Sequence, residues 1–318
     1  MSLPAIFSNL SLPLVGAPMF IVSGVELVTA QCKAGIVGTF PSANARRNST
    51  MDDWLTRIKD DLAAHDAANP DKPAAPYGVN LIVNRANVAL EDDLAACVRH
   101  KVPLVITSMG AREDVFEAVH SYGGIVLHDV INNFFAKKAV SKGADGLIAV
   151  AAGAGGHAGI TSPIALIEEI RQWFDGPLAL SGCISTGHAV LAAQAMGADL
   201  GYAGSLFIAT AEGNAVPPYK QMIVDCDSAD LVYTDYFSGV NANYLKPSIA
   251  NSGLDPENLP SKDLDEGQVR VGADKPKAWR DIWGSGQGIG AIDEVEPTAD
   301  AVARLVREYE AARGRLAG

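Results

Sequence analysis

Eight short, almost continuously apolar segments recur along the first two thirds of the chain. They are bounded by Gly, Pro or polar residues and lie at 12–19, 34–40, 77–83, 102–108, 124–130, 145–152, 177–184 and 200–208. Such uninterrupted apolarity is typical of strands in a parallel sheet that is covered on both faces. Between most of these segments the apolar residues recur at helical spacing instead, most clearly in 88–101, 111–122, 132–143, 163–174 and 186–197. Strand and helix are therefore expected to alternate.

This alternation predicts an α/β fold, a TIM (β/α)8 barrel that spans residues 1–212. Eight strand–helix units suit a barrel, whose usual size is roughly 250 residues. The structural alternative is a doubly wound sheet, which more often has about six strands. The connection formed by residues 41–76 is long, which predicts an extra helix and a loop over the barrel.

The regular alternation ends after residue 208. Residues 213–285 hold one helical stretch and then a region rich in Gly, Asn and Pro, which we interpret as a cap-like insertion. Its segment 229–280 either covers a site or packs on a neighbouring subunit. Residues 286–318 contain an amphipathic helix with Thr298 as the predicted N-cap, and we expect this helix to pack back on the outside of the barrel.

The composition favours small-molecule chemistry. The 318 residues are 48% hydrophobic and carry a formal net charge of -12, whereas nucleic acids and anionic membranes bind clustered Lys and Arg. The N-terminus lacks a signal-peptide pattern and no apolar run reaches the length of a membrane span, so we expect a cytoplasmic protein. The four cysteines form no CxxC pair, and no metal site is predicted.

Two of the predicted strand ends carry loops suited to a phosphate. In a TIM barrel the functional groups gather at the C-terminal ends of the strands, and the loops after the seventh and eighth strands often bind phosphate through backbone N–H groups. Here these loops read SGCISTG and AGSLF, with Ser181, Gly182, Gly204 and Ser205 as the predicted cradle. The alternative is that the glycines only make tight turns. Cys183 suits a small buried neighbour better than a nucleophile.

His157 is the candidate catalytic residue because it lies among four glycines in AAGAGGHAGI, residues 151–160. Clustered glycines mark a close approach to a ligand or a turn with positive φ. An imidazole with an ordinary pKa of about 6.5 can take a proton from a weak carbon acid. A second candidate is the pair His128 and Asp129, of which at most one points into the site because neighbours in a strand face opposite ways.

Two further glycine-rich stretches allow more than one interpretation. GAGGHA, residues 153–158, formally matches a dinucleotide fingerprint, but a helix should follow directly, and here it begins more naturally at Ser162 and Pro163. A Rossmann fold is therefore disfavoured. WGSGQGIGAI, residues 283–292, is either a flexible hinge or a loop laid against a flat ligand.

Together these motifs resemble the nitronate monooxygenase family, formerly called 2-nitropropane dioxygenases, which are FMN-dependent TIM barrels. GAPM, GVNL, GADGLIAVAAGAGGHAG, SGCISTGHAVLAAQAMGADLGYAGSLFIATAE and WGSGQG occur in the family's order. The resemblance implies FMN at the barrel mouth, a small-molecule substrate with O₂, and His157 as the catalytic base; it also allows a homodimer. The cofactor-binding residues that it implies are Ala17, Pro18, Met19, Asn80, Asp129, Ala154, Gly155, Gly156, Ser181, Gly182, Cys183, Gly204, Ser205, Trp283 and Gln287.

Three positions depart from the family pattern. Gly153 and Val150 stand where members typically carry acidic or other polar residues. Asp129 stands where some relatives carry a lysine that meets the flavin, so the surroundings of the ring become more negative and its reduction potential is expected to fall.

The leading hypothesis is an enzyme that oxidises alkyl nitronates, and also neutral nitroalkanes, with O₂ to carbonyl compounds and nitrite. The first alternative is an FMN-dependent NAD(P)H:quinone or enoyl-thioester reductase, since enzymes of this kind share the scaffold and its motifs. The second is a non-catalytic barrel that binds a phosphate-bearing ligand through the same loops.

Overall fold

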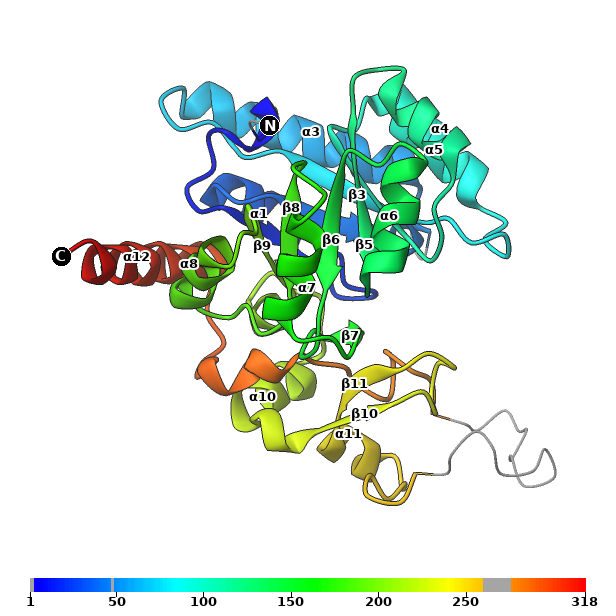
Figure 1. Ribbon diagram of the computed structural model, residues 1–318, viewed down its shortest axis with the longest axis vertical. Helices are drawn as coiled ribbons and strands as arrows, with labels where there is room; N and C mark the ends of the chain where they lie inside the picture. Colours follow the sequence, from blue (N-terminus) through cyan, green and yellow to red (C-terminus); the bar gives the residue numbers. More distant parts are fainter. Residues whose placement is uncertain (1–2, 47–48, 260–275) are drawn as a thin grey trace.

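A computed structural model, which describes residues 3–46, 49–259 and 276–318, contains eight parallel strands in a nearly closed barrel (Figure 1). The strands are β1 (Leu14–Gly16), β2 (Gly38–Pro41), β3 (Tyr77–Ile82), β4 (Leu104–Ser108), β5 (Ile125–Val130), β6 (Gly146–Val150), β8 (Leu178–Ser181) and β9 (Leu200–Ala203). They pair in the order β1-β9-β8-β6-β5-β4-β3-β2, and a parallel bridge between Val15 and Val37 brings the two ends of the sheet together. Each predicted apolar segment holds one strand, so the TIM barrel is confirmed and the doubly wound sheet is wrong.

Helices cover the outside of the barrel. They are α1 (Val25–Ala34), α3 (Met51–Ala68), α4 (Leu90–His100), α5 (Glu113–His120), α6 (Asn133–Ser141), α7 (Pro163–Arg171) and α8 (Gly187–Ala195), with the short α2 (Ser42–Ala45) after β2. The five clearest helical patterns are all confirmed. None of the helices in the described part of the chain has the length and apolarity that a membrane crossing requires.

The prediction that residues 41–76 hold an extra helix over the barrel is wrong in one respect. The helix, α3, exists, but it contacts α1 and α4 and is a regular member of the outer ring. Its buried residues Leu55, Ile58 and Leu62 recur every three or four positions, which gives one apolar face toward the barrel. A capping box between Thr50 and Asp53 fixes its start.

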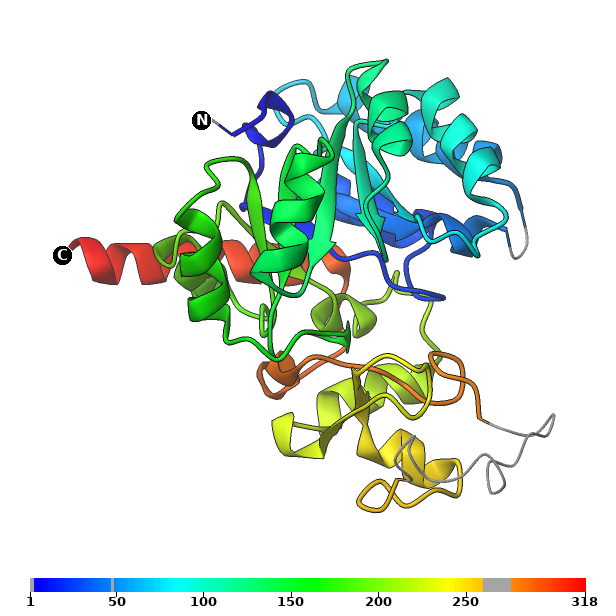
Figure 2. The same cartoon turned by 45° about the vertical axis from the view of Figure 1, so that its right-hand side comes forward.

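The C-terminal helix α12 (Thr298–Ala317) packs against α8 and α1, as expected of a helix on the outside of the barrel (Figures 1 and 2). It covers this part of the ring because the helix that follows β9, α9 (Ser205–Ile208), has only four residues. Thr298 is not the N-cap: it is the first helical residue, and Pro297 precedes it. The backbone N–H and hydroxyl of Thr298 both donate to Glu212 Oε2, at 2.9 and 2.7 Å, so a distant carboxylate replaces the local cap.

The contact of α12 with the barrel gives a stability prediction. Leu305 is 1% exposed in this helix, whereas Leu316 near its end is 78% exposed. We expect Leu305→Ala to lower the free energy of unfolding by about 2–5 kcal/mol, because it leaves a cavity in the packed layer. The matched control Leu316→Ala should change it by less than about 0.5 kcal/mol. Urea unfolding followed by circular dichroism measures both, and equal losses would contradict the packing described.

A smaller lobe covers one end of the barrel (Figure 2). It contains α10 (Pro217–Asp225), β10 (Leu231–Thr234), β11 (Ala242–Leu245) and α11 (Lys246–Asn251), with short 3-10 turns at Ser228–Asp230 and Gln287–Ala291. β11 pairs antiparallel with β10 and with β7 (Gly156–His157), which comes from the loop after β6. The predicted insertion 213–285 thus supplies most of this lobe, and its residues 260–275 lie outside the described part of the chain.

Candidate active site

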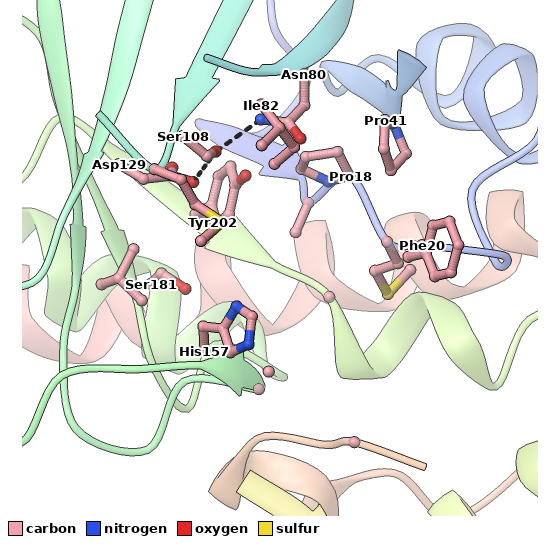
Figure 3. Close-up of a pocket in the computed structure, with 18 of the residues that line it drawn as sticks. Pro18, Phe20, Pro41, Asn80, Ile82, Ser108, Asp129, His157, Ser181 and Tyr202 are labelled. Atoms are coloured by element: carbon pink, nitrogen blue, oxygen red, sulfur yellow. Dashed lines mark hydrogen bonds between the residues drawn. The ribbon is translucent and has the colours of Figure 1, made fainter. Parts of the chain in front are cut away.

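A cavity of about 880 Å³ lies between the C-terminal ends of the barrel strands and the covering lobe. Figure 3 shows its wall, with side chains from several strands facing the side chain of His157. The barrel contributes residues such as Pro18, Asn80 and Tyr202, and the covering lobe contributes Val240 and Trp279. This end of a TIM barrel is where catalytic residues gather, so the cavity is the candidate active site.

Three segments pack together beside the cavity: the loop after β6 at 153–155, the start of α9 at Ser205, and the 283–292 stretch. The backbone N–H of Gly286 donates to Ser205 Oγ at 2.8 Å, and the backbone N–H of Gln287 donates to Gly153 O at 2.9 Å. A Cβ atom on Gly155 would lie 2.8 Å from the backbone nitrogen of Gly286, so only glycine allows the two loops to approach this closely. The 283–292 stretch is therefore a packed loop and not a flexible hinge.

His157 lies on β7 at the rim of the cavity, and residues of the covering lobe hold its ring. The Nε2 atom is 2.9 Å from Ser238 Oγ, and the ring meets Trp279 edge to face at 5.5 Å. Because the Ser238 hydroxyl donates to Val240 O at 2.9 Å, Nε2–H donates to Ser238 and Nδ1 is the nitrogen left to accept a proton. Partial burial lowers the pKa of His157 below its ordinary value. The neutral imidazole therefore prevails above that lowered pKa, which includes neutral pH.

Asp129 ends a short chain of hydrogen bonds on the opposite wall (Figure 3). Asn80 Nδ2 donates to Ser108 Oγ at 2.7 Å, and Ser108 Oγ donates to Asp129 Oδ2 at 2.5 Å. Asp129 Oδ1 is buried without a hydrogen-bond partner among the described residues. Burial raises the pKa of Asp129 to about 6, against the opposing effect of the Ser108 hydrogen bond.

The neighbouring His128 faces the other side of β5. Its Nδ1 lies 2.7 Å from Thr107 Oγ1, and its ring packs on Phe116 of α5 at 6.2 Å. Burial lowers the pKa of His128 to about 4, so this histidine is neutral and structural. Both residues border the cavity, but only Asp129 takes part in the hydrogen-bond chain of its wall.

The model of the nitronate monooxygenase family matches residues 4–308, nearly the whole chain. The chain belongs to the nitronate monooxygenase family. It is accordingly a flavin-dependent oxidoreductase. A nitronate monooxygenase of Neurospora crassa is 23% identical over 93% of this chain and 88% of its own length.

Two solved structures share the fold of this nitronate monooxygenase family member. Nitroalkane oxidase from Streptomyces ansochromogenes is similar with a TM-score of 0.78 and 24% identity over 98% of this chain and 99% of that chain. FabK from Thermotoga maritima is similar with a TM-score of 0.74 and 22% identity over 98% of this chain and 97% of that chain. At these identities the likeness extends to the fold and leaves the reaction open.

The cavity of this family member brings together most of the residues that the sequence singled out. Those that line it are Ala17, Pro18, Met19, Asn80, Asp129, Gly155, Gly156, His157, Ser181, Gly204 and Ser205. The others are near it without lining it: Ala154, Gly182, Cys183, Trp283 and Gln287. Trp283 stacks on Tyr219 at 5.0 Å, and Gly182 and Cys183 form a turn with φ of 136° and 59°. The cofactor roles of all these residues remain predictions.

Four residues at the site were not predicted from the sequence: Ser108, Tyr202, Ser238 and Trp279. The first two could have been found, because Ser108 ends one predicted strand and Tyr202 lies in another. Ser238 and Trp279 could not, since no pattern ties residues 81 and 122 positions away to His157.

The cavity of this family member fits a flavin in two respects. Its buried wall leaves an acceptor, Asp129 Oδ1, without a partner, which suits the polar edge of a ring. Its rim carries the hydroxyls of Ser181 and Ser205 beside Gly204, which suits a phosphate. In the described part of the chain no group of three or more His, Cys, Asp or Glu side chains could hold a metal ion.

Proposed function

We propose that this protein binds FMN in the cavity and oxidises alkyl nitronates, and also neutral nitroalkanes, with O₂ to carbonyl compounds and nitrite. The observation that carries the proposal is that a neutral histidine, His157, faces the same cavity as the serine- and glycine-lined loops and Asp129. When bound, FMN accepts electrons from the organic substrate and passes them to O₂, while the protein supplies binding, orientation and proton transfer.

The proposed binding roles follow from where the residues lie along the wall. Ala17, Pro18 and Met19 directly follow β1 and form an apolar surface for the flavin ring. The turns at Ser181 and at Gly204 and Ser205 hold the phosphate through hydroxyls and backbone N–H groups. This division follows the usual position of phosphate sites after the seventh and eighth strands of such barrels.

His157 is the proposed general base for neutral nitroalkanes. Its Nδ1 atom takes the α-proton of the substrate, and the hydrogen bond from Nε2–H to Ser238 keeps the ring in that tautomer and orientation. A nitronate has already lost this proton, so His157 only orients it. The base is required for one substrate class and dispensable for the other.

The test is an anaerobic absorbance spectrum of the FMN-loaded protein mixed separately with propyl nitronate and with NADH. A spectral change of the flavin with the nitronate and none with NADH supports the proposal. If only NADH bleaches the flavin rapidly, the result supports the reductase alternative instead. A colourless protein that takes up no FMN would favour a non-catalytic barrel.

A further inference from the structure

We propose that Asp129 is a proton acceptor coupled to the redox state of the bound flavin: when the flavin gains two electrons, the Asp129 carboxylate takes up one proton from the solvent. The electrons come from the organic substrate in turnover or from an added reductant, and the proton converts the carboxylate to the carboxylic acid. This inference rests on the flavin site proposed above and adds a second proton-handling group to it, on the wall opposite His157.

The hydrogen bonds around Asp129 fix its orientation. Ser108 Oγ accepts from the amide of Asn80 at 2.7 Å, so its single proton is directed at Asp129 Oδ2, 2.5 Å away. The same Asn80 amide also donates to Ile106 O at 3.2 Å, which anchors it to β4. Asp129 Oδ2 already accepts the hydrogen bond from Ser108. Oδ1 has no partner among the described residues, so it is the atom that remains to meet a ligand in the cavity.

The surroundings of Asp129 make its charge sensitive to a new negative charge nearby. Besides Asp129, the titratable residues that line the cavity are His128, Lys138, His157, Tyr202 and Tyr219. Burial and the charge of Asp129 raise the pKa of Tyr202 well above its ordinary value, so this phenol stays neutral. His128 is neutral and faces the helical layer. Lys138 comes from α6 and His157 from β7, elements other than the strands that hold the Asp129 network.

The direction of the coupling follows from electrostatics. Burial already raises the pKa of Asp129 to about 6, so near neutral pH the carboxylate prevails by a small margin. Electrons added to an adjacent ring make that carboxylate a neighbour of like charge, which raises its pKa further. Between the two pKa values, reduction of the flavin therefore takes up one proton more than it would without Asp129.

The test is the midpoint potential of the bound flavin as a function of pH, from 6 to 9, in the FMN-loaded protein and in Asp129→Asn. Asparagine keeps the shape and an acceptor for Ser108 but cannot titrate. Each additional proton taken up on reduction steepens the pH dependence of the midpoint potential by about 30 mV per pH unit, which is the value for a two-electron couple. We expect the wild type to be steeper than Asp129→Asn by this amount over part of the range. Asp175→Asn, which removes an exposed carboxylate, should behave as the wild type.

A second variant keeps the test decisive if Asp129→Asn binds flavin poorly. Ser108→Ala removes the hydrogen bond that lowers the pKa of Asp129, so the steep region should move to higher pH. Identical pH profiles in the wild type and in whichever of these variants binds flavin overturn the inference and leave the FMN proposal standing. Failure of the wild type to take up FMN would overturn both.

Discussion

Replacement of His157 by Asn should lower kcat/KM for a neutral nitroalkane by roughly 10²–10⁴-fold, the range that general acid–base catalysis contributes. The same variant should change kcat/KM for the corresponding nitronate by less than about tenfold, because that substrate has no α-proton to lose. The structural reason is that His157 lines the cavity and its Nε2–H is held by Ser238 at 2.9 Å, which leaves Nδ1 to accept the proton. Steady-state assays with nitroethane and ethyl nitronate measure both values.

The direction in which nitroalkane activity changes with pH follows from the pKa of His157. The pKa of His157 is lowered by burial, so the base form is present above that pKa and activity toward nitroalkanes falls as pH drops through it. The matched control is His188→Asn, since His188 is an exposed histidine on α8 and should leave both substrates unaffected. Equal losses on nitroethane and on ethyl nitronate would remove His157 from the role of base.

The second large effect is expected on FMN binding, from a substitution at Gly155. A Cβ atom there would lie 2.8 Å from Gly286 N and 3.1 Å from Ser285 C, both backbone atoms that cannot rotate away. We expect Gly155→Ala to force the 284–286 loop outward and weaken FMN binding by roughly 5- to 150-fold, because such overpacking costs about 1–3 kcal/mol. Flavin fluorescence titration of the apoprotein measures the change in Kd.

The control for this variant is Gly314→Ala. Gly314 is a glycine of α12 whose added Cβ would meet no atom within 4 Å, and alanine favours a helix, so FMN binding should not change. If Gly155→Ala bound FMN as tightly as the wild type, the packing of the two loops would have no part in holding the cofactor.

The barrel could be predicted from the sequence because its strands are buried on both faces and read as uninterrupted apolar runs. The two corrections concern features that a local pattern in the sequence does not determine. Residues 41–76 contain a barrel helix, but a long connection and a Pro-rich end resemble an addition. Thr298 has the side chain of an N-cap, yet its cap is a carboxylate 86 positions earlier, at Glu212.

The candidate site was predictable where it lies on strand ends and unpredictable where it depends on the covering lobe. His157 was marked by its glycines, and the steric contact between Gly155 and Gly286 shows what those glycines allow. Its partner Ser238 lies between β10 and β11 and reaches His157 only because β11 pairs with β7. The Asn80, Ser108 and Asp129 chain joins three neighbouring strands, so it emerges only once their order and register are known.

O₂ consumption by the FMN-loaded protein distinguishes nitronate oxidation from reductase activity when propyl nitronate is the organic substrate and no nicotinamide is present. An oxygen electrode follows O₂ while nitrite and the carbonyl product are assayed in the same sample. We expect O₂ uptake to depend on the nitronate, and nitrite and the carbonyl compound to form together. A protein that consumes no O₂ with nitronates, but oxidises NADH when a quinone or an enoyl thioester is added, would contradict it.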